Sequence, residues 1–210
     1  MVDAPGMKTA LCLVCLFAFA TALAGAEVDV GRETSGELFL RWTQTFEGGG
    51  EVDRGPTLEV YEDGTVVAVF PAYMKRAGRR SMRLSPVERK GLRRLVAGAR
   101  VDEFDAGRVG DECAAQEAER RAGASDPDLY EVHDAATTRI EVAIHGSTAV
   151  RGGAGSLPVR RRVKAAWYAL GATARRHPSV ASIQRLDHLE QAMKKLLRDP
   201  RLKPRAEPVQ

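Results

Sequence analysis

Residues 57–70 have the sequence TLEVYEDGTVVAVF, in which Asp63-Gly64 separates two runs rich in β-branched and aromatic residues. An Asp-Gly pair in such a setting is the strongest short-range signal for a β-hairpin, because both central residues of the two-residue turn need positive φ. We therefore predict strands over 57–62 and 65–70, joined by a two-residue turn with Gly64 at positive φ.

Two further strands are predicted beside this hairpin. Residues 37–45, ELFLRWTQT, place Leu40 and Trp42 on the same side of an extended chain, since side chains alternate between the two faces of a strand. The segment 46–56 contains four glycines and a proline, and we expect a loop there. Residues 82–84 are predicted to form a short strand.

A helix is predicted to follow at once. Ser85 can cap it, Pro86 suits the first helical position, and Glu88 completes a capping box. Its expected end is Gly98. One face collects the residues expected to be buried, which are Gly91, Leu92, Leu95, Val96 and Ala99.

The second half of the chain repeats the plan of hairpin and helices. Residues 137–144 predict a strand that turns at His145-Gly146 into a partner over 147–151. A short helix is expected before it, over 114–122. Two helices are expected after it, the first from Ser156 to His177 with Val159, Val163, Ala166, Trp167 and Leu170 inward, and the second over 179–198 with Ile183, Leu186, Leu189, Met193 and Leu196 inward.

These elements predict an α+β fold, with an antiparallel sheet built from two hairpins and helices packed on one face. The expected organisation is a signal peptide over 1–26, a flexible N-terminus over 27–36, a single domain over 37–198 and a polar tail over 199–210.

The N-terminus has the order of a secretory signal peptide. Met7-Lys8 precedes an apolar run over 10–23, and Ala24-Gly25-Ala26 matches a small-residue cleavage site. Translation can begin at Met1 or Met7. Cys15 lacks the small preceding residues of a lipid-anchor site, so simple cleavage is favoured. We expect a periplasmic or secreted protein without a transmembrane helix after cleavage.

Charge is unevenly distributed along the chain. Residues 102–134 carry eleven acidic and three basic residues, whereas residues 158–205 carry thirteen basic and three acidic ones. A basic surface suits an anionic partner, although the acidic segment can instead neutralise it within the fold. No specific nucleic-acid motif accompanies these charges. Cys113 would be the only cysteine left after cleavage, which excludes an intramolecular disulfide and a cysteine metal site.

Several of these segments together resemble a group of small exported bacterial domains of unknown function. The resemblance runs over residues 37–175, and Gly55 stands where the "CPxYxxxIxxDG" strand pair of those domains often has cysteine. It supports the fold and the exported setting, and it implies no activity. The segments that carry it are Gly55-Pro56-Thr57, Tyr61-Glu62-Asp63-Gly64, Leu84-Ser85-Pro86, Phe104, Thr138-Arg139-Ile140 and Leu157-Pro158.

The best candidate site is the glycine-rich loop that leads into the expected helix at Ser156. Free backbone N–H groups at a helix N-terminus and nearby cations attract anions. The residues that would form this anion site are Gly153, Gly155, Ser156, Arg160 and Arg161. The loop has no Gly-Lys-Ser/Thr sequence, so a nucleotide site is not expected.

Catalytic and metal motifs are not evident. Ser147 and Ser156 lie outside any G-x-S-x-G sequence, His133 lacks ligand spacing, and the acidic residues after Asp102 lack calcium-loop spacing. We expect no cofactor and no metal. The leading hypothesis is an exported non-catalytic binding protein for anionic envelope material or a protein partner; the alternative is an envelope hydrolase with its site near His133 and His145.

The signal-peptide hypothesis predicts that exported protein begins near Glu27. Intact-mass measurement of the protein recovered outside the cytoplasm would check this. A full-length species found only in the cytoplasm would contradict it.

Overall fold

The computed structural model describes residues 36–48, 51–123, 135–147 and 158–205. The predicted signal peptide and almost all of the predicted flexible N-terminus lie outside these ranges. Among the described residues, none of the helices combines the length and apolar character that crossing a membrane requires.

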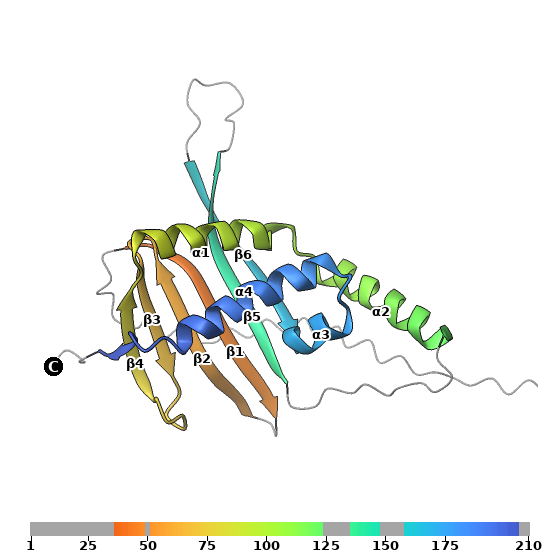
Figure 1. Cartoon of the computed structure of the whole chain (residues 1–210), viewed down its shortest axis with the longest axis horizontal. Helices are drawn as coiled ribbons and strands as arrows, with labels where there is room; N and C mark the ends of the chain where they lie inside the picture. Colours follow the sequence, from red (N-terminus) through yellow and green to blue (C-terminus); the bar gives the residue numbers. More distant parts are fainter. Residues whose placement is uncertain (1–35, 49–50, 124–134, 148–157, 206–210) are drawn as a thin grey trace, which may run out of the picture. The chain divides into compact units, whose positions relative to one another are not determined.

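A seven-stranded antiparallel sheet forms the centre of the domain (Figure 1). Its spatial order is β6-β5-β1-β2-β3-β4-β7, so β1 joins the first meander to the later hairpin. This confirms the predicted α+β class. The strands are β1 (Leu38–Gly48), β2 (Glu51–Tyr61), β3 (Thr65–Phe70), β4 (Gly78–Arg83), β5 (Ala136–Ser147), β6 (Pro158–Tyr168) and β7 (Lys203–Pro204).

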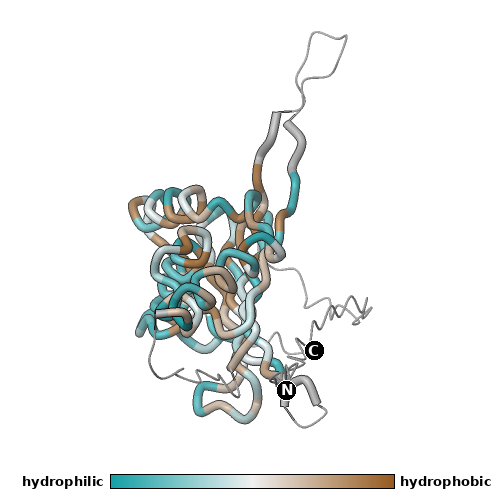
Figure 2. The backbone as a smooth tube through the Cα atoms, turned by 90° about the vertical axis from the view of Figure 1, so that its right-hand side faces the viewer, coloured by the Kyte–Doolittle hydropathy of each residue, from teal (hydrophilic) through white to brown (hydrophobic). Residues whose placement is uncertain are grey.

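Helices α1 (Pro86–Ala99) and α4 (Ala181–Leu197) lie across one face of this sheet (Figure 1). Along the helices, hydrophobic and hydrophilic residues alternate (Figure 2), as expected where one side of a helix packs on the core and the other side faces solvent. The remaining helical elements are the 3₁₀ turn η1 (Val101–Glu103), α2 (Ala106–Gly123) and α3 (Leu170–Arg176). The most deeply buried core side chains include Leu40, Trp42, Leu58, Ile140, Ile183, Leu186, Leu189 and Met193.

The first hairpin is confirmed, but its turn has three residues instead of two. The Gly64 N–H donates to the Tyr61 carbonyl at 2.9 Å, and Gly64 has φ +90°. Asp63 keeps a negative φ, and its carboxylate accepts from both the backbone N–H and the hydroxyl of Thr65, each at 2.9 Å. A tight turn followed by a glycine at positive φ also joins two antiparallel strands, and it allows Asp63 to keep an ordinary backbone conformation.

The capping box of α1 is confirmed. The Ser85 N–H donates to Glu88 Oε2 at 2.7 Å, and the Glu88 N–H donates to Ser85 Oγ at 3.3 Å. The helix continues past Gly98 and ends where Arg100 adopts a left-handed conformation with φ 48°. The last predicted helix is confirmed as α4.

The predicted helix from Ser156 to His177 is wrong over most of its length. Residues Pro158–Tyr168 form β6, which pairs with β5, and only Leu170–Arg176 is helical. Val163 and Ala165 face the helices, while Arg162 and Lys164 are exposed. The stretch satisfies both helical and strand periodicity, and pairing along β5 decides for the strand.

Other element boundaries also differ from those predicted from the sequence. The predicted turn at His145-Gly146 is wrong because β5 continues to Ser147, and most of the partner expected over 147–151 lies outside the described residues. Helix α2 is twice as long as predicted. The expected polar tail contains β7, which pairs with β4, and the fully buried Leu202.

A buried carboxylate fixes α4 on the sheet. Glu190 is 1% exposed, and its Oε1 accepts from Thr138 Oγ1 at 2.5 Å and from Gln44 Nε2 at 3.2 Å. Lys194 Nζ lies 3.1 Å from its Oε2. Because a buried charge is costly unless it is paired, this cluster fixes the position of α4 over β1 and β5.

Thr138→Val preserves the side-chain shape and removes one donor to this carboxylate. We expect a loss of about 1.5–3 kcal/mol in the free energy of unfolding, because the donor serves a buried charged acceptor. Urea denaturation would measure the loss. Thr43→Val on the outer face of β1 is the control, and equal values for the two variants would contradict the role of Glu190.

Arg201 links the C-terminal segment to α1 through ion pairs. Its NH2 lies 2.6 Å from Glu88 Oε1 and 2.8 Å from Asp199 Oδ2. Hydrogen bonds from Arg201 lower the pKa of Glu88 and that of Asp199 to about 2, and the Ser85 backbone adds to the effect at Glu88. These contacts place Leu202 in the core and β7 beside β4.

The lowered pKa values predict acid sensitivity. Because the carboxylates are more acidic when folded, their stabilisation is present above their ordinary pKa values of 4.5 and 3.8 and is lost as pH falls towards about 2. Unfolding free energies of wild type and Arg201→Gln, measured from pH 6 to 2, should therefore converge at low pH. Arg198→Gln is the control, and a constant difference between wild type and Arg201→Gln would contradict the prediction.

Candidate functional site

The sheet face opposite α1 and α4 carries a row of charges across four strands. Strand register places Lys164 beside Glu141, Glu141 beside Arg41, and Arg41 beside Glu59. Arg41 donates from Nε to Glu59 Oε1 at 3.0 Å. Glu141 lies 3.9 Å from Arg41, 3.6 Å from Arg162 and 3.8 Å from Lys164. The single carboxylate of Glu141 therefore forms ion pairs with three cationic side chains.

The cations project further into solvent than the carboxylates. The side chains of Glu141 and Glu59 are only 12% and 17% exposed, whereas those of Arg162 and Lys164 are 53% and 65% exposed. Arg139, two residues before Glu141 on the same face of β5, is also exposed. We call Arg139, Arg162 and Lys164 the cationic face, because solvent meets their positive charge first.

The position of this face follows from strand alternation. Val163 and Ala165 point to the core, so Arg162 and Lys164 must point the other way. Strand β6 also lies at one edge of the described sheet, and β7 lies at the other. Charged side chains on an edge strand discourage unwanted strand pairing, and this structural role accounts for part of the charge.

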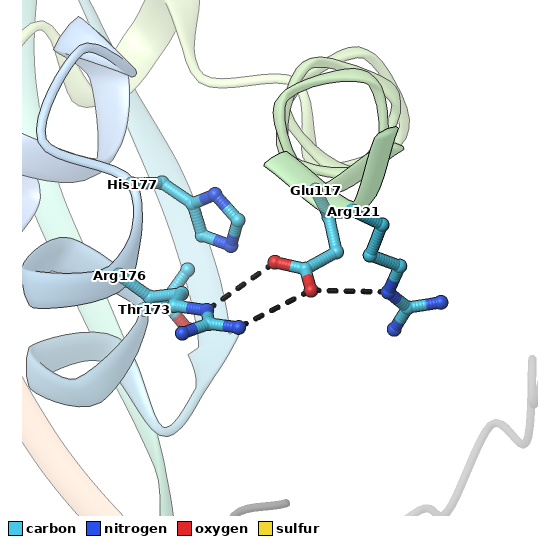
Figure 3. Close-up of a pocket in the computed structure, with 5 residues that line it drawn as sticks. All are labelled: Glu117, Arg121, Thr173, Arg176 and His177. Carbon is cyan, nitrogen blue, oxygen red and sulfur yellow. Dashed lines mark hydrogen bonds and ion pairs between the residues drawn. The ribbon is translucent and has the colours of Figure 1, made fainter. Parts of the chain in front are cut away.

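A second polar cluster lies between α2 and α3 (Figure 3). Glu117 accepts from Arg176 Nε and NH2, both at 3.2 Å, and from Arg121 Nε at 3.2 Å. Arg120 NH2 lies 2.5 Å from the same carboxylate. An open pocket of about 230 Å³ is lined by Glu117, Arg121, Thr173, Arg176 and His177.

Among the described residues, the lining of this pocket has two guanidinium groups, those of Arg121 and Arg176, and one carboxylate, that of Glu117. Three guanidinium groups surround the Glu117 carboxylate. Hydrogen bonds from Arg120, and secondarily from Arg121, hold the pKa of Glu117 below its ordinary value. Glu117 therefore remains an anion at neutral pH.

The predicted anion site does not have the predicted setting. Gly153, Gly155 and Ser156 lie outside the described residues. Arg160 and Arg161 belong to strand β6 instead of the first turn of a helix, and Arg161 is exposed. Glu117 and Arg176 were not predicted from the sequence. Their pairing joins residues 59 positions apart and leaves no local signal.

The alternative catalytic residues do not form a described site. His133 lies outside the described residues, and the side chain of His145 is not described. Within the described ranges, no group of three metal-ligating side chains occurs. Cys113 is buried, and this burial, aided by the charge of Glu112, raises the pKa of its thiol and disfavours the reactive thiolate.

Comparison with models of known protein families finds no family that matches the chain. A search of curated proteins finds no significant match. The charges and geometry of this protein are therefore the basis for inferring its function.

Proposed function

We propose that the protein is an exported, non-catalytic binding domain and that its ligand is an anionic polymer of the cell envelope, held on the cationic face. The observation that carries this proposal is a difference in exposure between the two signs of charge. The side chains of Arg162 and Lys164 are exposed to solvent, whereas the carboxylates of Glu141 and Glu59 are largely shielded from it. A ligand that approaches the sheet meets Arg139, Arg162 and Lys164 before it meets Glu141.

The spacing of the cations supports a polymer over a small molecule. Side chains two residues apart on a strand are separated by about 7 Å, and neighbouring strands by about 5 Å. Arg162 and Lys164 follow β6, while Arg139 lies on the adjacent β5. Such a spread offers several weak contacts to repeated anionic groups and no enclosed cavity for one compact ligand.

The exported setting is part of the proposal and is supported by the sequence of residues 7–26. An anionic polymer is favoured over an acidic protein because its repeated anionic groups match cations spread over β5 and β6. The exposed Tyr168 on the same face of β6 would offer an acidic protein one aromatic contact. Binding to an acidic protein is left as an outcome of the test.

Dextran sulfate provides a direct probe, with neutral dextran as the uncharged control. We expect binding that weakens steeply as salt rises, since exposed charges are screened within about 8 Å at physiological ionic strength. The triple variant Arg139→Gln, Arg162→Gln, Lys164→Gln should lose about tenfold in affinity, because it removes three exposed pairs of about 0.5 kcal/mol each and about 1.4 kcal/mol corresponds to tenfold. Fluorescence anisotropy or calorimetry would measure the affinity.

The matched control removes three exposed cations from α1 and α4 with Lys90→Gln, Arg94→Gln and Lys195→Gln. It lowers net charge equally and should bind almost as wild type does. Equal losses of affinity for dextran sulfate in the two triple variants would mean that binding depends only on net charge. This result would contradict binding at the cationic face. Absence of dextran sulfate binding at low salt would reject the polymer as ligand, and binding to a folded acidic protein such as serum albumin would then indicate a protein partner.

A further inference from the structure

Three arginines on the sheet face opposite α1 and α4 form no ion pair with any described residue. They are Arg54 on β2, Arg79 on β4 and Arg139 on β5, and we call them the unpaired arginines. Within the same ranges, Arg79 Nε is shielded from solvent and also lacks a hydrogen-bond partner. The cations beside Glu141, in contrast, each lie within ion-pair distance of its carboxylate. The unpaired arginines therefore carry the positive charge that this face leaves for an external anion.

Strand register connects two of these arginines by a row of directly opposite residues. From β5 through β1, β2 and β3 to β4, the row consists of Arg139, Thr43, Thr57, Val69 and Arg79. It lies on the outer face, because the next residue of β5, Thr138, points to Glu190 of α4. In the neighbouring row, Thr45 lies opposite both Thr137 and Arg54. Threonines thus fill the space between the unpaired arginines.

The middle of the row from Arg139 to Arg79 is uncharged and meets solvent. Thr43 and Thr57 are partly exposed, and Val69 is 38% exposed. Neighbouring strands lie about 5 Å apart, so the four strand spacings from β5 to β4 separate the ends of the row by about 20 Å. A ligand that contacts both arginines must be extended, and it must place uncharged groups between its anionic ones.

A polysaccharide that carries carboxylate groups has this pattern. Threonine hydroxyls both donate and accept hydrogen bonds, as the hydroxyl groups of sugars do. The C–H groups of a sugar ring can pack on the exposed Val69, and a carboxylate fits the two parallel donors of an arginine. A polyphosphate carries charge on every unit and has neither hydroxyl nor C–H groups for the middle of the row.

We propose that the anionic polymer is a carboxylate-bearing polysaccharide and that its chain crosses the strands along the row from Arg139 to Arg79. This inference rests on the proposed function, because it takes an anionic polymer as the ligand. It extends the contact from the cationic face on β5 and β6 across β1, β2 and β3 to β4. Arg139 belongs to both surfaces and makes them continuous.

Polygalacturonate, a sugar polymer with a carboxylate on each unit, and inorganic polyphosphate, which has no sugar ring, are the two probes. Calorimetry at low salt would measure the affinity of the whole mature protein for each. The double variant Thr43→Val, Thr57→Val keeps the side-chain shapes and removes two hydroxyl groups. It should bind polygalacturonate about fivefold more weakly than wild type and should bind polyphosphate equally well.

The arginine end of the row is tested separately. Arg79→Gln should lower the affinity for polygalacturonate about threefold, because one charge pair is removed. Arg83→Gln is the matched control, since it makes the same change in charge on the same face of β4 but lies outside the row, opposite Thr65. Arg54→Gln repeats the test at an exposed side chain, and urea denaturation would establish that each variant is folded.

Wild-type affinity of the threonine variant for polygalacturonate, or equal losses for the two probes, would overturn the inference. Equal affinities of Arg79→Gln and Arg83→Gln for polygalacturonate would also overturn it. These results leave the cationic face untouched, because the threonine variant retains its three cations and dextran sulfate measures them independently. If the triple variant of the cationic face binds dextran sulfate as wild type does, while the threonine variant shows its selective loss, the proposed face is wrong and the row is supported.

Discussion

The pairing of β1 with both β2 and β5 is the constraint on which the rest of the structure depends. β1 lies between the β2-β3-β4 meander and the β5-β6 hairpin, so it converts two local units into one sheet. Its inward residues Leu40 and Trp42 are fully buried, and Gln44 donates to the buried Glu190 of α4. Strand β1 therefore connects the two strand units through backbone pairing, and through its inward side chains it also positions α4 on the sheet.

Strand alternation makes the two faces of this sheet chemically different. Leu40, Trp42 and Ile140 turn towards α1 and α4 and join an apolar layer, and the next residue along each strand turns to the opposite face. On that face the charges of β1, β2, β5 and β6 come into register as a row. The surface proposed to bind an anionic polymer is thus a direct consequence of how the core is packed.

Two charge clusters share one arrangement, in which a single carboxylate forms ion pairs with three cations. Glu141 has this position on the sheet and Glu117 has it between α2 and α3. They differ in shape and in burial. The sheet surface is broad and its outermost cations are largely solvated, which suits weak repeated contacts, whereas Arg176 lies in a pocket where a fork-shaped pair is stronger.

The sequence by itself determined the elements whose signals are local. Gly64 marks the first hairpin, Ser85 and Glu88 cap α1, and helical spacing identifies α4, because each signal lies within a few residues of the structure it specifies. Only the tertiary structure decided that residues 158–168 form a strand, since their pattern fits a helix as well and the pairing edge of β5 resolves the choice. The clusters at Glu190 and Glu117 were decided in the same way, because each joins residues more than 50 positions apart, and folding alone brings such charges together.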